Sequence, residues 1–230
     1  MFDDLFLTVS IPAYNDSISL RLLVNDIQSY FKKFDFRYGV LIINDGSSDA
    51  THQVIEELKV QYTNVSSIHH EQNLGFGKTL KKVFTLPKSE WILFLPGDYQ
   101  FTVENIDRFL MLKNQFDFMI GFRKTRKDNI NRKLYSYVYN KLISSLFGYE
   151  VHDVNSIVFF KTSLLKSIIL SSSSAFIHAE LFIKMMKVQV KCVEIEVIHK
   201  KRAFGFGAGA NLNVIFNTLK DLIKYKLKVL

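Results

Sequence analysis

Short apolar segments alternate along this chain with segments of helical periodicity, and this order restricts the fold more than any other feature. Segments rich in β-branched residues are typical of buried strands. They lie at residues 6–11, 38–43, 65–69, 91–98, 116–120, 156–160 and 192–197. Helical spacing of apolar residues predicts helices near residues 17–34, 51–61, 78–84, 103–115, 132–146, 162–170, 178–187 and 211–230. Strands that alternate with helices form a mainly parallel sheet with helices on both faces, so the predicted fold class is α/β.

The composition is that of a folded protein that needs no disulfide bond or structural metal to fold. The chain has 230 residues, of which 48% are hydrophobic and 23% charged, and a chain of this size can bury a sufficient core. Its single cysteine, Cys192, excludes an intrachain disulfide and a zinc site made of cysteines. The N-terminal residues lack the features of a signal peptide, and no apolar run reaches the ~18 residues of a membrane span. We therefore expect a cytoplasmic protein that does not cross a membrane.

The net charge of +8 favours a polyanionic partner, which could be nucleic acid, an anionic bilayer surface or a phosphorylated substrate. The charge is concentrated at residues 121–133 and 199–202, and the chain ends in the basic segment KDLIKYKLKVL. No helix-turn-helix or zinc-finger pattern is present, so nucleic acid is not the expected partner. The segment NLGFGKTL (73–80) lacks the spacing of a phosphate-binding P-loop.

Polar clusters follow four of the predicted strands at their carboxyl ends, which is where ligands bind in open α/β sheets. These clusters are PAYND (12–16), NDGSSD (44–49), PGDYQ (96–100) and GFRKTR (121–126). The carboxylates of the first two clusters could accept hydrogen bonds from a base or a ribose, or they could form ordinary turns that cap helices. The sequence thus predicts one functional edge of the sheet.

Asp98 and Gln100 lie on the same side of the chain after the fourth strand. Mg²⁺ and Mn²⁺ take oxygen ligands of this kind together with diphosphate oxygens, although an aspartate in a turn after a strand is also common. Several basic residues could neutralise a diphosphate and a second phosphate, or could be ordinary surface residues. They are Arg123, Arg126, Arg132, Lys200, Lys201 and Arg202.

Several motifs carry a resemblance to a known family when they are taken in chain order. They are SIPAYND (10–16), INDGSSDAT (43–51), EQNLGFGKTL (71–80), LPGDYQF (95–101), GFR (121–123), Arg132, HDVNS (152–156), AEL (179–181) and HKKRAFGFG (199–207). Together they resemble the family 2 glycosyltransferases of GT-A fold, and most of all the dolichyl- or polyprenyl-phosphate sugar (mannose) synthases. The resemblance implies one catalytic domain over residues 1–210, followed by a basic amphipathic helix over 211–230.

The same resemblance implies roles for individual residues. Those expected to shape the nucleotide-sugar pocket are Pro12, Tyr14, Asp16, Asp45, Gly75 and Lys78, with Asp45 near the base. The expected ligands of Mg²⁺ or Mn²⁺ are Asp98 and Gln100, and the expected phosphate ligands are Arg123, Arg132 and Arg202. The expected catalytic residues are Asp98, Asp153, Glu180 and Arg202. The implied reaction is a direct displacement that inverts the anomeric carbon of a UDP- or GDP-sugar.

The acceptor is indicated by the residue after Glu180. Hydroxyl-transferring relatives commonly carry an aspartate base there, whereas this chain has Leu181, which favours a lipid phosphate because an anion needs no base. Asp153 or Glu180 could still serve as a base, so a glycan hydroxyl of a surface polysaccharide or lipooligosaccharide stays as the alternative. Either acceptor suggests a role in cell-envelope biosynthesis. A catalytically weak scaffold that binds a nucleotide sugar is a third hypothesis.

The chain departs from the family pattern at four positions. Pro96 replaces the first metal-binding aspartate, Asn44 replaces an aspartate near the base, His178 replaces an acid, and Gly207 replaces a serine. The C-terminal helix also allows more than one interpretation. We expect its apolar face to pack on the domain or on a second copy of the chain, with peripheral contact to an anionic bilayer as the alternative.

Overall fold

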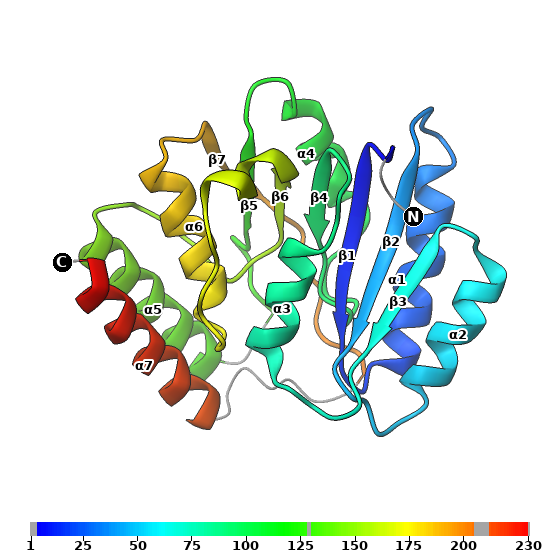
Figure 1. The fold of residues 1–230 in the computed structure, drawn as a ribbon, viewed down its shortest axis with the longest axis horizontal. Helices are drawn as coiled ribbons and strands as arrows, with labels where there is room; N and C mark the ends of the chain where they lie inside the picture. Colours follow the sequence, from blue (N-terminus) through cyan, green and yellow to red (C-terminus); the bar gives the residue numbers. More distant parts are fainter. Residues whose placement is uncertain (1–3, 128–129, 205–211, 230) are drawn as a thin grey trace.

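The computed structural model describes residues 4–127, 130–204 and 212–229. Its described part contains a seven-stranded sheet in the order β3-β2-β1-β4-β6-β5-β7 (Figure 1). The strands are β1 (Leu7–Ala13), β2 (Tyr38–Asn44), β3 (Val65–His69), β4 (Trp91–Phe94), β5 (Phe118–Phe122), β6 (Val158–Lys161) and β7 (Cys192–Glu196). Strand β6 runs antiparallel to β4 and β5, and all other neighbours in the sheet are parallel. The predicted mainly parallel α/β sheet is therefore confirmed.

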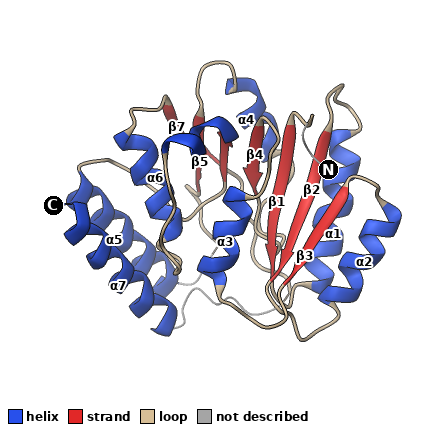
Figure 2. Cartoon of the chain, viewed as in Figure 1, coloured by secondary structure: helices blue, strands red, loops and turns tan. Residues whose placement is uncertain are grey.

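Helices cover both faces of the sheet and form a three-layered structure (Figure 2). One face packs against α1 (Ser17–Phe31), α2 (Thr51–Gln61) and α4 (Asn105–Leu112). The other face packs against α3 (Phe76–Thr85), α5 (Ile130–Phe147), α6 (Ile177–Lys187) and α7 (Leu212–Val229). Each face of the sheet therefore has its own hydrophobic core.

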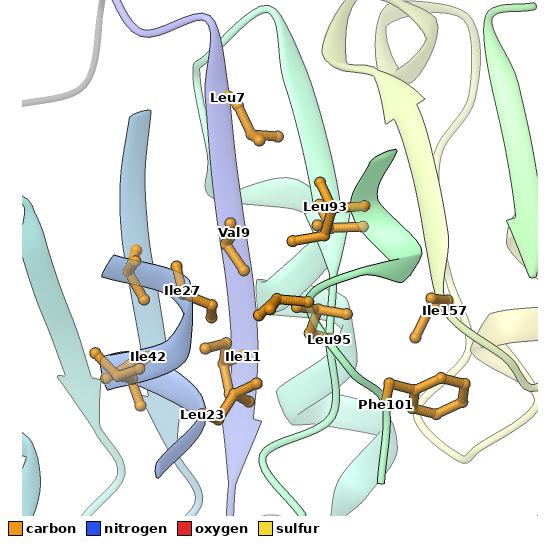
Figure 3. Close-up of a cluster of buried hydrophobic side chains, with 14 of the residues drawn as sticks. Leu7, Val9, Ile11, Leu23, Ile27, Ile42, Leu93, Leu95, Phe101 and Ile157 are labelled. Carbon is orange, nitrogen blue, oxygen red and sulfur yellow. The ribbon is translucent and has the colours of Figure 1, made fainter. Parts of the chain in front are cut away.

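The period-two alternation of the strands explains the two cores. In β1, Leu7, Val9 and Ile11 point toward α1, where Leu23 and Ile27 meet them (Figure 3). All five of these side chains are at most 1% exposed. Full burial of one such side chain contributes about 1.5–3 kcal/mol, so this contact fixes α1 firmly beneath the carboxyl end of β1.

Strand β4 and the helix expected over 162–170 are among the elements that are shorter than expected. Strand β4 ends at Phe94 rather than residue 98, because Pro96 has no N–H to donate to a neighbouring strand. The segment predicted as a helix over 162–170 is a six-residue 3₁₀ helix, η1 (Thr162–Ser167). None of its residues is fully buried, and Leu164 and Leu165 pack only partly against the core, which is too little packing to stabilise a longer helix.

The loop after β4 packs tightly on the end of β1. The Gly97 N–H donates to the Pro12 carbonyl at 3.3 Å. A Cβ at residue 97 would lie 2.8 Å from that same oxygen, so a side chain there would force the two loops apart. Gly97 thus lets the carboxyl ends of β1 and β4 approach each other, which is the first requirement for a site at this edge.

A second close approach lies at the N-terminal end of α3. A Cβ on Gly77 would lie 2.3 Å from the Ser173 carbonyl oxygen. We call residues 171–174, the sequence SSSS, the serine loop. Its other side contacts α7, because Asp221 Oδ2 accepts hydrogen bonds from the N–H groups of Ser173 (3.3 Å) and Ser174 (3.1 Å). Helices α3 and α7 therefore both rest on the serine loop.

Candidate active site

Two carboxylates and one guanidinium meet at the carboxyl edge of the sheet. Arg202 Nη2 lies 3.5 Å from Asp16 Oδ1 and 3.3 Å from Asp98 Oδ2. Asp16 follows β1, Asp98 follows β4, and Arg202 follows β7 along the chain. The side chains of all three are at most 19% exposed. We call this group the Asp16–Arg202–Asp98 cluster.

Local hydrogen bonds explain how each member of the cluster is positioned. The Asp16 N–H donates to Thr51 Oγ1 at 2.9 Å, and its carboxylate accepts from the Tyr14 N–H at 3.3 Å. The Asp16 side chain makes no capping hydrogen bond to α1, so the expected helix cap is not formed by it. The Asp98 carboxylate accepts from the Gln100 N–H at 3.2 Å. Both carboxylates are therefore fixed by their own loops.

Arg202 is carried to the cluster by a segment that pairs with the loop after β4. The Lys200 N–H donates to the Gln100 carbonyl at 2.7 Å, and Gln100 Nε2 donates to the Lys200 carbonyl at 3.2 Å. Phe101 and His199 form an antiparallel bridge beside them. Gln100, an expected metal ligand, thus also anchors the segment that holds Arg202.

The cluster has more negative charge than Arg202 neutralises. Burial raises the pKa of Asp16 to about 6, although the charge of Arg202 opposes this. Burial also raises the pKa of Asp98, against the charges of Arg202, Arg132 and Arg123. Burial therefore disfavours the charged form of both carboxylates, and a bound cation would favour it. Two hard oxygen donors with surplus negative charge suit Mg²⁺ or Mn²⁺, so these residues fit such an ion.

A second ion pair lies where β5 ends. The Arg123 guanidinium makes a bidentate contact with Asp153, with Nε 2.5 Å from Oδ2 and Nη2 2.7 Å from Oδ1. Arg126 Nη1 lies 3.8 Å from Asp153 Oδ1. Asp153 is 3% exposed, so its carboxylate is enclosed by these two guanidinium groups.

A cleft of about 170 Å³ opens beside this ion pair. Its lining residues are Phe122, Arg123, Arg126, Lys133, Ser136, Tyr137, Asn140, His152 and Asp153. Two arginines and a lysine outnumber its aspartate, so the cleft favours an anion. Arg132 is half-buried at the start of α5, and its charge acts on Asp98.

Glu180 has no exposed surface, and its oxygens are occupied by the serine loop. Its carboxylate accepts from the N–H groups of Ser171 (2.9 Å) and Ser172 (2.7 Å) and from Lys184 Nζ (2.6 Å). Burial opposes ionisation, but these hydrogen bonds outweigh it and lower the pKa of Glu180. The described contacts thus give Glu180 a role in holding the serine loop, and its expected role at the reaction centre stays a prediction.

His178, which replaces an acid of the family pattern, is enclosed by aromatic rings. Its ring centroid lies 5.2 Å from that of Phe84 and 4.9 Å from that of Phe94. Burial lowers the pKa of His178 to about 3, so this imidazole is neutral at physiological pH. Gly207, another departure from the pattern, lies outside the described residues.

Asp45 lies directly after β2 and belongs to a buried hydrogen-bond chain. Its Oδ1 accepts from His70 Nδ1 at 2.8 Å and from the Leu74 N–H at 2.9 Å. His70 Nε2 lies 2.8 Å from Lys82 Nζ on α3. The sequence analysis assigns no role to His70 or to Lys82. No sequence signal marks either residue, because the three partners are 25 and 12 residues apart.

The other expected pocket residues lie on the same edge of the sheet. Pro12 is buried in β1, whereas Tyr14 is 46% exposed beside it. Gly75 precedes the first turn of α3. Lys78 is exposed on that turn. Their contacts with a ligand stay predictions.

A separate group with metal-ligand chemistry lies on α2 and β3. Ligand atoms of His52, Glu56 and His69 lie within 4.8 Å of one another. However, Asn44 Oδ1 accepts from the Ser47 N–H at 3.1 Å, which leaves the Asn44 amide to donate to His69 Nδ1 at 3.1 Å. A neutral His69 then has its proton on Nε2, where it bonds to Glu56 Oε1 at 3.0 Å. A metal would need that nitrogen's lone pair, so we assign the group to hydrogen bonding.

Comparison with known proteins adds an independent result. The sequence model described as Glycosyl transferase family 2 matches residues 8–176. The undecaprenyl-phosphate 4-deoxy-4-formamido-L-arabinose transferase of Photorhabdus laumondii subsp. laumondii is 26% identical over 222 residues, which are 94% of this chain and 66% of that protein. CsbB of Bacillus subtilis (strain 168) is 26% identical over 148 residues, or 64% of this chain and 45% of that protein. The chain thus spans less than two thirds of each of these relatives.

Solved structures show the same fold at low identity. Glucosyl-3-phosphoglycerate synthase from Mycobacterium tuberculosis in complex with UDP superimposes with a TM-score of 0.72 at 13% identity, over 97% of this chain and 79% of that one. The complex of that enzyme with Mn²⁺, UDP and glucosyl-3-phosphoglycerate gives 0.66 at 14% identity, over 94% and 79%. These matches confirm the expected GT-A fold.

Proposed function

The chain belongs to glycosyltransferase family 2, and we propose that it is an inverting enzyme that transfers a sugar from a nucleotide-diphospho-sugar to a polyprenyl phosphate. The observation that carries this proposal is the Asp16–Arg202–Asp98 cluster at the carboxyl edge of the sheet. Its surplus negative charge suits a divalent cation, and the neighbouring arginines suit phosphates. The relative from Photorhabdus laumondii supports the acceptor class by its name.

The donor is proposed to bind across the ends of β1, β2 and β4, within reach of Pro12 and Tyr14. Asp45 can only accept hydrogen bonds, so it favours a base that has a ring N–H, as uracil and guanine do. Gly75 and Lys78 lie at the N-terminal end of α3, where backbone N–H groups and an ammonium favour phosphate. These features support a UDP- or GDP-sugar as the donor.

In the proposed reaction, an oxygen of the acceptor phosphate forms a bond to the anomeric carbon. The bond between that carbon and the diphosphate oxygen breaks, and the nucleoside diphosphate leaves with the electron pair. Mg²⁺ or Mn²⁺, when held by Asp98, Gln100 and Asp16, supplies positive charge for the leaving diphosphate. Arg202 is the protein's own cation at that place, and it stabilises the same negative charge.

The acceptor side of the proposal rests on which carboxylates are available as a base. A hydroxyl acceptor needs a base, but Asp153 is enclosed by Arg123 and Arg126, and Glu180 is bonded to the serine loop. Leu181 has no exposed surface and no proton-accepting group. A phosphate acceptor needs no base, and the cationic cleft beside Arg123 offers it Lys133. These contacts support the lipid phosphate over a glycan hydroxyl.

Helix α7 supports a place for such a lipid substrate. Its buried side contacts the core through Leu222 and Tyr225. Its opposite side carries a row of apolar residues that are 37–75% exposed, namely Leu212, Phe216, Leu219, Ile223 and Leu227. Exposed lysines come one position after three of these residues, at Lys220, Lys224 and Lys228, and so form a neighbouring stripe about 100° further round the helix. We propose that this row rests on an anionic bilayer, where apolar and basic side chains both find partners. None of the described helices is long and apolar enough to cross a bilayer.

Vesicle flotation tests this contact. Binding to vesicles that contain phosphatidylglycerol is expected for the unmodified chain and is expected to fall in Phe216→Ser/Ile223→Ser. Val60→Ser on α2 is the matched control, because Val60 is 88% exposed outside the row. A stable dimer in light scattering that the double variant dissociates would assign the row to a second copy of the chain instead.

The transfer reaction is tested by measuring nucleoside diphosphate release from a panel of UDP-, GDP- and dTDP-sugars, with and without a polyprenyl phosphate and Mn²⁺. Release that needs the lipid phosphate and is lost in Asp98→Ala supports the proposal. Asp117→Ala is the control, since Asp117 directly precedes β5 and so lies at the opposite edge of the sheet. Donor binding without turnover would instead indicate a scaffold. Such binding is measured in thermal unfolding, where a donor at 100 times its Kd raises the free energy of unfolding by roughly 2.7 kcal/mol.

A further inference from the structure

His70 and Lys82 continue from Asp45 in a buried hydrogen-bond chain, and neither has a part in the proposed reaction. Asp45 is 3% exposed and His70 is 8% exposed, and Lys82 reaches them from the last turn of α3. We propose that His70 and Lys82 are positioning residues, which hold the Asp45 carboxylate in the orientation that binds the nucleobase of the donor. This inference rests on the proposed function, because it assumes that Asp45 contacts a base.

With Asp45 as a carboxylate and Lys82 as an ammonium, the two distances allow one arrangement of protons on His70. A carboxylate can only accept, so the 2.8 Å contact with Asp45 requires that His70 Nδ1 carries a proton. An ammonium can only donate, so the 2.8 Å contact with Lys82 requires a lone pair on His70 Nε2. Lys82 thereby fixes the Nδ1–H tautomer of His70.

This tautomer determines which oxygen of Asp45 is left for a ligand. Oδ1 is occupied by His70 Nδ1–H and by the Leu74 N–H. Among the described residues, none donates a hydrogen bond to Oδ2. Two donors on one oxygen fix the rotation of the carboxylate, so Oδ2 keeps one direction in which to meet a ring N–H. The other His70 tautomer would turn a lone pair toward Oδ1 and would release this constraint.

The tautomer can be measured on the free protein by long-range ¹H–¹⁵N correlation NMR of imidazole-labelled samples. The expected result is a single His70 form with the proton on Nδ1, and Lys82→Met is expected to bring in the Nε2–H form. Lys81→Met is the matched control, because Lys81 is exposed on the same helix. A His70 that is Nε2–H in the unmodified protein, or that ignores Lys82→Met, would overturn the inference.

Kinetics on the donor tests the consequence for binding. His70→Ala is expected to raise KM for the nucleotide sugar about tenfold with kcat little changed, since base recognition is shared by ground and transition states. His70→Asn is expected to recover much of this loss, because the asparagine amide can replace Nδ1–H. Equal KM values in all variants, at any thermal stability, would overturn the positioning role. If the unmodified chain binds no donor at all, the proposed function fails, whereas the NMR result still stands by itself.

Discussion

Two pairs of carboxylates in this molecule lie in opposite electrostatic surroundings. Asp16 and Asp98 follow the parallel strands β1 and β4, both contact the Arg202 guanidinium, and have pKa values that burial raises. Asp153 and Glu180 lie in the second half of the chain, and each has its own cationic partner. Burial raises the pKa of both members of the first pair, whereas each member of the second pair has a close ion-pair partner of its own. The same residue type therefore creates room for a cation in one region and fixes loops in the other.

The largest expected effect is on stability, and it concerns the second of these pairs. Glu180→Ala removes the acceptor of the Ser171 and Ser172 N–H groups and leaves Lys184 without its buried partner. Breaking a buried ion pair from one side costs about 3–5 kcal/mol, so the free energy of unfolding in urea is expected to fall by that amount. Glu196→Ala, at a half-exposed pair, is expected to cost less than about 1 kcal/mol. Similar losses in the two variants would contradict the comparison.

The second effect is on turnover and concerns the pair formed by Asp16 and Asp98. Asp98→Asn keeps the shape of the side chain but removes a charge that burial already disfavours. Turnover is expected to fall by about 10²–10³-fold, and the free energy of unfolding is expected to stay the same or to rise. The matched variant Asp153→Asn is expected to unfold more easily, because Arg123 would lose its bidentate partner. Loss of stability in Asp98→Asn would show that this pair is structural as well.

The smallest effect is a pH dependence from Asp16, whose pKa burial raises to about 6. The protonated carboxyl is favoured in the folded state, so its contribution to stability is complete below the unfolded pKa of 3.8 and is lost as the pH rises through about 6. The contribution is at most about 3 kcal/mol. In Asp16→Asn, the urea midpoint is expected to depend less on pH between pH 4 and about 6. If the midpoint of the variant depends on pH as strongly as that of the unmodified protein, Asp16 is not the source of the pH dependence.

The fold followed from the sequence where local pattern and packing agree. The ends of α2 and β3 match the expected residues 51–61 and 65–69. The apolar face of α2 meets the core through Val54, Ile55 and Leu58, and β3 pairs with β2 over its whole length. The segment expected as a helix over 162–170 forms only a 3₁₀ helix, because the apolar residues of that helix are no more than partly buried against the core. The spacing of apolar residues along the chain does not show which of them the tertiary fold will cover.

The site was predicted only as a set of residues on one edge of the sheet. Arg202 reaches Asp98 because Gln100 pairs with Lys200, and these two residues are 100 positions apart in the sequence. His70 is positioned to bond Asp45 by its contact with Lys82, which lies on helix α3. Sequence motifs identified the carboxylates and cations, and tertiary contacts decided which of them share a charge.

The close contact at Gly77 limits how relatives of this chain can vary. A Cβ there would lie 2.3 Å from the Ser173 carbonyl, so a β-carbon at this position requires a different path of the serine loop. A changed path would alter the hydrogen bonds that the loop gives to Glu180 and Asp221. Substitutions at these three positions, on α3, α6 and α7, should therefore occur together in descendants of a common ancestor, and the glycine should be the last of them to change.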